Sequence, residues 1–254
     1  MTVLLEGKNL NKWFIDKKKR VDALKDVSFF LQEGEVLGIV GESGSGKSTL
    51  LKVIAGMLKP DGGSLYYKGE EYTGQKPRRT GTFLQIIFQN PLSSFDPRMT
   101  MERSILESAR GEKDKERLLE LLKTVGLEEE LLSRKPSGLS GGQCQRMSIA
   151  RAFYSEAPIL LCDEITSALD VTTQAQVVAL LKQLKEEGRL SAIFVTHDIA
   201  LVSNLCDRIM VMKEGQCVEQ GATFDVIGHP KDEYTKILLE GARRQSIQEI
   251  KAYE

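Results

Sequence analysis

The sequence is 254 residues long and lacks any long hydrophobic run. A membrane-spanning helix needs about 18 or more apolar residues in succession, and no stretch of this chain approaches that length. The first residues, Met1–Glu6, meet a charge too early for a signal peptide, so we expect none. We therefore expect any link to a membrane to come through partner chains.

Cysteine is scarce, and its positions follow no ligand pattern. The four cysteines, Cys144, Cys162, Cys206 and Cys217, show no C-x-x-C spacing. Their arrangement argues against a structural metal site and against a disulfide framework. We expect reduced thiols, as in a cytosolic protein.

An excess of charge of one sign is also missing. The chain has 35 Lys and Arg against 36 Asp and Glu, which leaves a net charge of -1. This balance argues against a nucleic-acid binder that works through bulk charge, although it leaves a local basic patch open. The length of 254 residues suffices for one large domain or two small ones, and the 41% hydrophobic residues suffice for a sizeable core.

The chain does contain a glycine-rich stretch of distinctive spacing. Gly41–Thr49 fits the pattern G-x-x-x-x-G-K-[ST], a loop whose backbone N–H groups wrap a chain of phosphates. Lys47 brings a cation to the β- and γ-phosphates, and Ser48 offers a hydroxyl to Mg²⁺. A buried strand is predicted at Glu35–Val40 and a helix at Thr49–Met57, which is the context that this loop requires. The stretch therefore predicts nucleotide binding.

The segment before this loop predicts a hairpin. Apolar stretches at residues 2–10 and 21–31 indicate antiparallel strands joined by a charged, exposed loop. Trp13 and Phe14 stand just before that loop. An aromatic side chain in this position could stack on a purine, although an aromatic on a strand is more often part of the core.

The section from Asn90 to Phe153 has a different, helix-rich character. No long linker separates it from its neighbours, so we expect a subdomain inserted into the core. It contains Leu139–Gln143, with the sequence Leu-Ser-Gly-Gly-Gln, directly before a predicted helix at Cys144–Phe153. Glycines just before a helix favour an N-terminus that accepts an anion.

Three predicted buried strands deliver polar residues to their carboxyl ends, where ligands bind in open α/β sheets. The strand at residues 83–88 ends on Gln89, and the strand at 159–162 leads into Asp163 and Glu164. A carboxylate pair in this place suits an Mg²⁺-nucleotide site, in which one acid holds the metal and the other orients water. The strand at 191–196 delivers His197. Further along, we expect a helix at 171–187, a hairpin at 208–219 and helices from Phe224 onward.

These residues together resemble the ATP-binding subunits of ABC transporters over nearly the whole chain. Gly41–Ser48 is similar to Walker A, Ile159–Glu164 to Walker B, and Leu139–Gln143 to the family's signature sequence. Gln89 stands at the Q-loop, Ser167–Asp170 at the D-loop, and His197 at the switch histidine. The resemblance implies an α/β fold with a P-loop NTPase (RecA-like) core, an N-terminal antiparallel β-subdomain and an inserted helical subdomain. It implies a single ATP-binding domain over residues 1–254, with the core and β-subdomain at about 1–89 and 158–254 and the helical subdomain at about 90–157.

The resemblance also implies a role for each matching residue. The cofactors are ATP and Mg²⁺. Glu164 would polarise the attacking water, while Lys47 and His197 would contact the γ-phosphate. Mg²⁺ would be held by Ser48, Gln89 and Asp163. The residues expected to contact ATP are Phe14, with Trp13 as the weaker alternative, Gly41, Glu42, Ser43, Gly44, Ser45, Gly46, Lys47, Ser48, Thr49, Gln89, Ser140, Gly141, Gly142 and Gln143.

Members of this family work as assemblies, so the resemblance implies partners. Two ATP-binding subunits, identical or not, would face each other around two ATP molecules, with the signature of one against the ATP of the other. Two transmembrane permease subunits and an extracellular or periplasmic substrate-binding protein would complete the transporter, without nucleic acid. The chain would then lie at the cytoplasmic face of the cell membrane as a peripheral protein.

A finer resemblance concerns the cargo. The segment Phe88–Thr100 is similar to that of subunits that energise uptake of peptides and nickel, and His229 with Tyr234-Thr235 is similar more weakly. Peptides, nickel and metal chelates remain open as cargo. An exporter or lipid-extracting system, or a soluble ATPase acting on DNA or the ribosome, is the alternative. The segment Asn90–Met101, including Phe95 and Arg98, is expected to dock on the membrane partners.

Overall fold

The computed structural model describes residues 2–17, 19–74, 80–109, 111–166, 169–188 and 190–252, without the side chains of residues 173 and 243–252. The chain folds as two compact units. Unit 1 comprises Met1–Thr80 and Ser191–Glu254, and unit 2 comprises Gly81–Leu190. The division predicted from the sequence, with a helical insertion at 90–157, differs from this one and stays a prediction.

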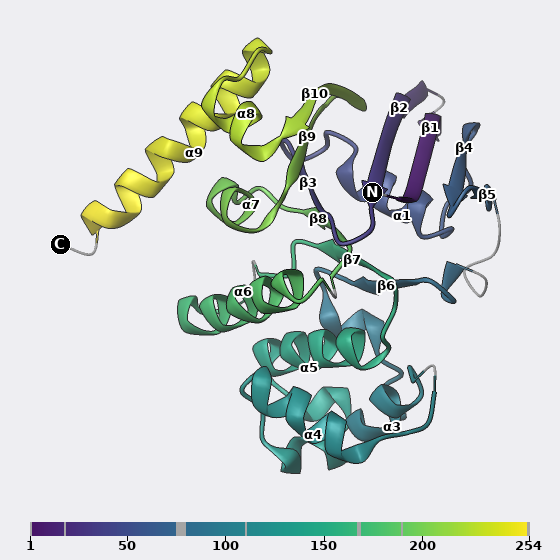
Figure 1. Cartoon of the computed structure of the whole chain (residues 1–254), viewed down its shortest axis with the longest axis vertical. Helices are drawn as coiled ribbons and strands as arrows, with labels where there is room; N and C mark the ends of the chain where they lie inside the picture. The colour runs from purple at the N-terminus through teal and green to yellow at the C-terminus, as the bar shows by residue number, and fades with distance from the viewer. Residues whose placement is uncertain are drawn as a thin grey trace. The chain divides into compact units, whose positions relative to one another are not determined.

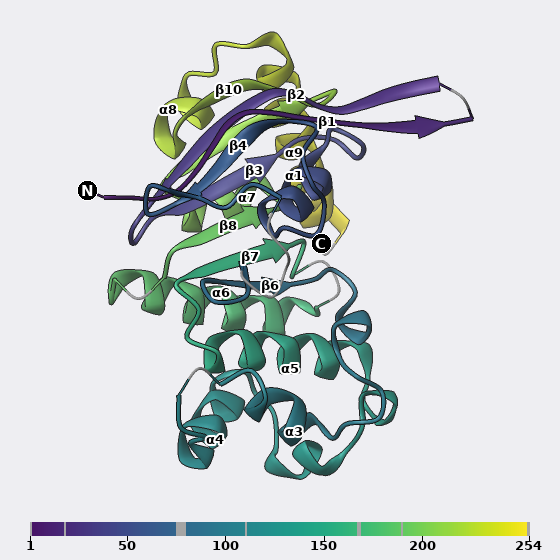
Figure 2. The same ribbon diagram turned by 90° about the vertical axis from the view of Figure 1, so that its right-hand side faces the viewer.

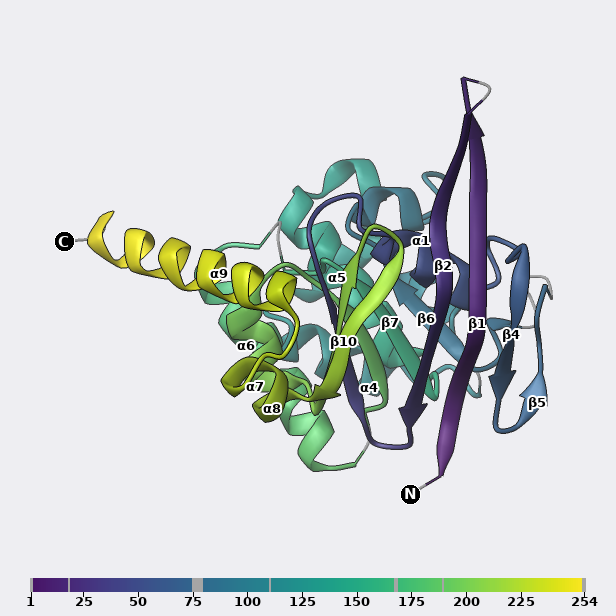
Figure 3. The same ribbon diagram turned by 90° about the horizontal axis from the view of Figure 1, so that it is seen from above.

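An antiparallel sheet forms the first part of unit 1. Its strands are β1 (Val3–Asp16), β2 (Lys19–Gln32), β4 (Gly62–Tyr67) and β5 (Glu70–Glu71), in the order β2-β1-β4-β5. The long hairpin of β1 and β2 extends past the other strands of the unit (Figures 2 and 3). The predicted hairpin is confirmed, but both strands are longer than predicted. Their outer arms are mostly exposed and carry no apolar alternation, so the sequence pattern did not mark them as strand.

Parallel strands form the second part of unit 1. They are β3 (Val36–Val40), β8 (Ala192–Val195) and β9 (Arg208–Lys213), with β10 (Gln216–Ala222) antiparallel to β9. The order is β10-β9-β3-β8. Every residue of β3 and β8 is buried, as expected for strands covered on both faces.

The helices of unit 1 cover these strands from two sides. They are α1 (Lys47–Ile54), α7 (Ile199–Leu205), α8 (Thr223–Gly228) and α9 (Glu233–Ala252). Figures 1 and 3 show α7, α8 and α9 on one side of β3 and β9, and α1 with the antiparallel sheet on the other. The core of the unit therefore lies on both faces of β3.

Unit 2 is mainly helical. Two parallel strands, β6 (Leu84–Ile87) and β7 (Ile159–Asp163), accompany the helices α3 (Met101–Leu106), α4 (Lys115–Thr124), α5 (Gly141–Tyr154) and α6 (Val171–Glu186). Single 3-10 turns lie at Pro91–Ser94, Glu129–Ser133 and Pro136–Gly138. In Figure 1, α5 lies between α6 and the pair α3 and α4. Its inner residues, from Met147 to Ala152, are almost all fully buried, so α5 forms the centre of the unit.

The four cysteines all fall in the described part of the chain and are thiols. Cys206 in unit 1 and Cys144 and Cys162 in unit 2 are buried, while Cys217 is partly exposed. Burial raises the pKa of Cys144, and burial also raises the pKa of Cys217 to about 11. Among the described helices, none is long and apolar enough to cross a bilayer.

Candidate functional site

The segment Gly41–Ser48 turns tightly between β3 and α1, and the turn requires two of its glycines. Gly41 has a φ of 149°, and a Cβ there would lie 2.2 Å from the carbonyl oxygen of Met212. Gly46 has a φ of 104°, and a Cβ there would lie 2.6 Å from the carbonyl oxygen of Ala23. A side chain at either position would therefore push the loop off the backbone of β9 or β2.

Lys47 lies inside the curl of this loop. Its side chain is only 6% exposed, and its ammonium donates hydrogen bonds to the carbonyl oxygens of Gly41 at 2.7 Å and Glu42 at 2.8 Å. The next element, α1, has Gly46 as its N-cap, which has no side chain to bond the first N–H groups of the helix. A buried cation and an uncapped helix N-terminus thus meet in one turn, which stabilises a bound phosphate.

The other residues of the loop differ in exposure. Glu42, Ser43, Gly44 and Ser48 are exposed, Ser45 is buried, and Gly46 and Thr49 are half-buried. The carbonyl oxygen of Ser45 accepts a hydrogen bond from the N–H of Gly215 at 3.0 Å, in the turn between β9 and β10. A Cβ at Gly44 would meet no atom within 4 Å. The loop therefore rests on a hairpin, while its outer side is open enough to receive a ligand.

His197 reaches the same edge of the sheet as the phosphate loop. The strands β3 and β8 are parallel neighbours, with Ile39 opposite Val195, and the N–H of Thr196 donates to the carbonyl oxygen of Ile39 at 3.2 Å. Gly41 lies two residues after Ile39, and His197 lies two residues after Val195. His197 is exposed, so the structure brings it and the loop to the carboxyl ends of adjacent strands, where α/β proteins bind ligands.

Phe14 and Trp13 lie on the outer arm of β1, and neighbouring residues of a strand face opposite sides. Phe14 is 40% exposed and Trp13 is 37% exposed. The ammonium of Lys12 lies 5.5 Å from the ring centre of Phe14, and the guanidinium of Arg20 lies 5.2 Å from that of Trp13. Since both rings are similarly accessible, the choice of Phe14 as the adenine contact stays a prediction.

Gln89, Asp163 and Glu164 lie together in unit 2. The strands β6 and β7 are parallel with Ile87 opposite Cys162, and the polar residues follow directly. The amide nitrogen of Gln89 donates to a carboxylate oxygen of Glu164 at 2.7 Å. Glu164 has a φ of 48°, in the left-handed region that a non-glycine residue rarely adopts. Such conformations are often found at functional sites, where the surrounding structure maintains them.

The signature residues form a self-contained helix start. Ser140 is the N-cap of α5, and its hydroxyl accepts a hydrogen bond from the N–H of Gln143 at 3.2 Å. The side-chain oxygen of Gln143 accepts one from the N–H of Ser140 at 2.9 Å, which completes a capping box. A Cβ at Gly141 or Gly142 would meet no atom within 4 Å. Of the D-loop, Ser167 and residue 168 lie outside the described residues.

The predicted site residues thus form separate groups. Unit 1 holds Phe14, the phosphate loop and His197, and unit 2 holds Gln89, Asp163, Glu164 and the signature. In the part of the chain that the structure describes, no three His, Cys, Asp or Glu side chains gather into a metal site. The predicted Mg²⁺ ligands are a hydroxyl, an amide oxygen and a carboxylate, which are the hard donors that suit this cation.

Sequence reasoning missed three residues that support these groups. Asp61 accepts hydrogen bonds from the N–H of Trp13 at 2.8 Å and from Lys12 at 3.2 Å, and the bond from Trp13 lowers the pKa of Asp61. Gln145 is fully buried and donates to the carbonyl oxygen of Ile165 at 3.0 Å, directly after Glu164. Tyr234 contacts the phosphate loop from α9. Each partner lies far away in sequence, so only the fold reveals the contact.

The expectation that Phe95 lies on a docking surface is wrong. Phe95 is only 5% exposed, and the guanidinium of Arg151 lies 4.3 Å from its ring centre. Arg151 also donates to the carbonyl oxygen of Ser94 at 2.6 Å, and burial lowers its pKa to about 10. Leu92 and Arg98 of the same segment are exposed. The apolar ring anchors the segment to α5, and the exposed residues alternate with it.

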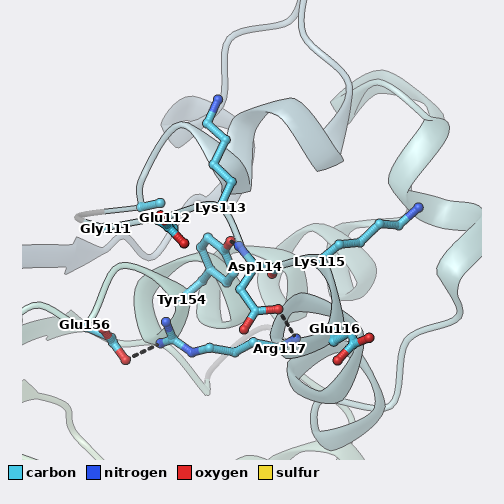
Figure 4. Close-up of a pocket in the computed structure, with 10 residues that line it drawn as sticks. Gly111, Glu112, Lys113, Asp114, Lys115, Glu116, Arg117, Tyr154 and Glu156 are labelled. Carbon is cyan, nitrogen blue, oxygen red and sulfur yellow. Dashed lines mark hydrogen bonds and ion pairs between the residues drawn. The ribbon is translucent and has the colours of Figure 1, made fainter.

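A cavity of about 560 Å³ lies at the start of α4 in unit 2, and none of the predicted nucleotide contacts lines it. The hydroxyl of Tyr154 accepts a hydrogen bond from the N–H of Asp114 at 2.8 Å there. In Figure 4, Arg117 reaches Glu156, at 3.0 Å, while Lys113 points away. These bonds fix the beginning of α4, so the cavity wall has a structural explanation.

The glycine-rich loop around a buried lysine, between a parallel strand and a helix, defines a P-loop nucleotide-binding protein. The model of the family described as ABC transporter matches residues 24–167, which is more than half of the chain. The chain belongs to the ABC transporter family. As such it binds ATP and is an ATPase coupled to transport, built on the P-loop NTPase fold.

Known proteins resemble the chain over most of its length. It is 43% identical to the oligopeptide transport ATP-binding protein OppF of Escherichia coli strain K12, covering 94% of this chain and 75% of that protein. It is 41% identical to OppF of Bacillus subtilis strain 168, covering 93% and 81% respectively. A solved structure, the dimeric post-hydrolysis state of the ATP-binding cassette MJ0796 bound to ADP and Pi, has a TM-score of 0.78 and 33% identity. It covers 87% of this chain and 99% of that one.

Proposed function

We propose that this chain is the ATP-hydrolysing subunit that energises uptake of peptides through partner membrane subunits. The observation that carries the proposal is its 41–43% identity to oligopeptide transport ATP-binding proteins over more than nine-tenths of its length. The segment Phe88–Thr100, which resembles that of peptide and nickel uptake subunits, supports it. Nickel and metal chelates remain alternative cargoes.

Within this function, Lys47 holds the β- and γ-phosphates of ATP. The burial of its ammonium inside the loop supports this role, because the charge is already placed where phosphate oxygens would enter. Phe14, the residues of Gly41–Thr49 and Gln89 complete the contacts of this subunit to the nucleotide. Ser48, Gln89 and Asp163 hold Mg²⁺, which, when bound, neutralises phosphate charge.

Glu164 accepts a proton from the attacking water, and His197 positions the γ-phosphate. The hydrogen bond from Gln89 to Glu164 supports a role for Gln89 in orienting that carboxylate. A positioned carboxylate base typically contributes a rate factor of about 10² to 10⁴. The left-handed backbone conformation of Glu164 is unfavourable for a non-glycine residue, and it is consistent with a side chain that must point in a particular direction.

The site is completed by a second ATP-binding subunit, identical or homologous, whose signature closes on the nucleotide held here. In return, Ser140, Gly141, Gly142 and Gln143 contact the ATP of that partner. The dimeric state of the similar cassette structure supports this arrangement. Two permease subunits and a substrate-binding protein outside the membrane complete the transporter. The chain then lies peripherally at the cytoplasmic face.

The test is carried out on the transporter co-purified with its membrane partners and reconstituted in vesicles. Glu164→Gln is expected to keep ATP affinity while hydrolysis and peptide uptake fall by about 10² to 10⁴. Glu120→Gln, on the exposed face of α4, is the matched control and should change neither. Hydrolysis at the wild-type rate in Glu164→Gln would remove Glu164 as the base. A binding protein that retains nickel or a chelate would overturn the cargo, and outward flux would indicate an exporter.

We also propose that the exposed part of residues 90–101 docks on the permease. The segment follows Gln89 directly, and the burial of Phe95 against Arg151 ties it to α5. Arg98→Glu is expected to lower uptake at least about tenfold in the vesicles, while ATP affinity of the isolated chain stays unchanged. Lys123→Glu, also exposed, is the control charge reversal. Normal uptake by Arg98→Glu would refute the docking assignment.

A further inference from the structure

A tertiary contact of the phosphate loop comes from the C-terminal part of the chain. Tyr234, in the first turn of α9, is only 7% exposed. Its hydroxyl oxygen accepts a hydrogen bond from the N–H of Glu42 at 3.0 Å. Glu42 is the second residue of the loop, and its carbonyl oxygen accepts from Lys47. One peptide segment is thus held by the nucleotide-site lysine on one side and by a tyrosine on the other.

Tyr234 is itself held firmly in place. The ammonium of Lys213 lies 4.9 Å from the ring centre of Tyr234. The backbone N–H of Tyr234 donates to the carboxylate of Asp232 at 2.8 Å. Glu219 on β10 accepts hydrogen bonds from the N–H groups of Lys231 at 2.9 Å and Asp232 at 3.1 Å. Burial alone would raise the pKa of Glu219, but these N–H groups, the Thr235 side chain and the Lys231 charge together outweigh burial and hold the pKa below its ordinary value. Glu219 therefore stays ionised and latches the start of α9 to β10.

The hydroxyl is in a form that suits this contact. Burial, together with the nearby carboxylate of Glu42, raises the pKa of Tyr234 above its ordinary value. The group therefore stays a neutral hydroxyl near pH 7, with an oxygen that can accept the Glu42 N–H. A phenylalanine ring would fill the same space and keep the Lys213 contact, but it would leave this N–H without its partner.

We propose that Tyr234 is a positioning residue of the nucleotide site, whose hydroxyl holds the loop at Glu42 in the shape that receives phosphate. The inference rests on the proposed role of Lys47. The Lys47 ammonium has three donors, and any donor that turns to a phosphate no longer holds the carbonyl oxygen of Gly41 or Glu42. The bond from Glu42 to Tyr234 and the bond from Gly215 to Ser45 remain on the outside of the curl. They keep the loop from rearranging when its inner bonds open.

The experiment compares two Tyr→Phe variants that each lose a hydroxyl accepting a backbone N–H; the Tyr154 hydroxyl also donates to the carbonyl oxygen of Asp114 at 3.0 Å. Tyr234→Phe removes the hydroxyl at the loop, and Tyr154→Phe removes the hydroxyl that accepts the Asp114 N–H in unit 2. ATP affinity is measured by titration of the isolated chain, and amide hydrogen exchange is followed in the peptide that contains Glu42. We expect Tyr234→Phe to bind ATP about three- to tenfold more weakly and to exchange faster at Glu42. Tyr154→Phe should leave both unchanged.

Equal affinity in Tyr234→Phe and wild type would overturn the inference, as would an equal loss in both variants. Lys47→Ala is measured in parallel: if it still binds ATP as wild type does, the nucleotide site itself is wrong and the role of Tyr234 falls with it. Loss of binding in Lys47→Ala with no change in Tyr234→Phe refutes the role of Tyr234 alone.

A second variant covers the case in which Tyr234→Phe folds poorly. Glu219→Ala removes the carboxylate that holds the start of α9 and keeps the Tyr234 side chain itself unchanged. Because Tyr234 is then held less firmly, this variant should also weaken ATP binding. In the double variant the two losses should fall short of adding, because both act through one contact. Full additivity, or an unchanged affinity in Glu219→Ala, would contradict the proposed path.

Discussion

Two helices of this chain start at glycines, and their first turns are completed in different ways. The helix α1 begins after Gly46, which offers no cap, and its first residue is the buried Lys47. The helix α5 begins after Ser140, which forms a capping box with Gln143 of the same segment. The start of α1 therefore has no side-chain cap, whereas the start of α5 has a reciprocal one.

The glycines themselves differ in the same sense. Gly41 and Gly46 have positive φ angles and no room for a Cβ, so they make the curl of the loop possible. Gly141 and Gly142 are helical residues with open space around them, so no side chain protrudes from the surface at these two positions. A glycine-rich helix start can thus shape its own pocket or present a smooth face to another molecule. This difference agrees with a phosphate loop that acts within the subunit and a signature that acts on a partner.

The largest expected effect concerns the start of α1. Lys47→Ala should weaken ATP binding by the isolated chain on the order of 100-fold, because it removes the cation that offsets phosphate charge. Lys52→Ala, at an exposed position later in the same helix, is the matched control. Titration with ATP measures both. Unchanged affinity in Lys47→Ala would show that the two helix starts do not differ in the way described.

A bulky cation at the start of α5 should act in trans. Ser140→Arg is expected to lower ATP hydrolysis of the assembled dimer at least about tenfold and to leave ATP affinity of the isolated chain intact. Loss of the cap should also cost about 1 kcal/mol of stability. Mixing one mutant with one wild-type subunit locates the defect, and Ser133→Arg, exposed in the same unit, serves as control. A defect confined to the mutant's own ATP would contradict the assignment.

The smallest effect separates the two kinds of glycine. Gly46→Ala should lower the free energy of unfolding by roughly 2 kcal/mol or more, since its Cβ has no space and its φ is unfavourable. Gly141→Ala should leave it unchanged or raise it by up to about 1 kcal/mol, because alanine is the better helix former. Thermal and urea unfolding measure both. Equal changes in the two variants would erase the distinction between these glycines.

Much of the fold follows from local sequence patterns. The apolar runs that became β3, β7 and β8 are buried on both faces, so they stand out from their polar neighbours. The hairpin of β9 and β10 was predicted at residues 208–219, and the helix-rich character of residues 90–153 was also predicted. The helix α7 was not predicted; its N-cap Asp198 accepts a hydrogen bond from the N–H of Leu201 at 2.9 Å. The helix α5 starts at Gly141 rather than Cys144, since the capping box brings the glycines into the helix.

The site was predictable where chemistry is concentrated in one segment, and not where it depends on distant partners. The loop Gly41–Ser48 contains its own glycines, cation and hydroxyl, so its pattern is legible in sequence. Tyr234 meets Glu42 only after the chain has passed through both sheets of unit 1. Phe95 was misjudged for a related reason: its burial depends on Arg151, which no local pattern connects to it.

The three buried thiols, Cys144, Cys162 and Cys206, can report local opening of the structure. A buried thiol reacts slowly with an alkylating reagent, because the reagent must first reach it. Cys206 lies in unit 1, while Cys144 sits in the signature helix and Cys162 in the strand before the acid pair. Each thiol can be modified only when the structure around it opens. The alkylation rate at each cysteine therefore reports how often that part of the molecule opens. The natural chain thus carries separate reporters for its two units and needs no introduced label.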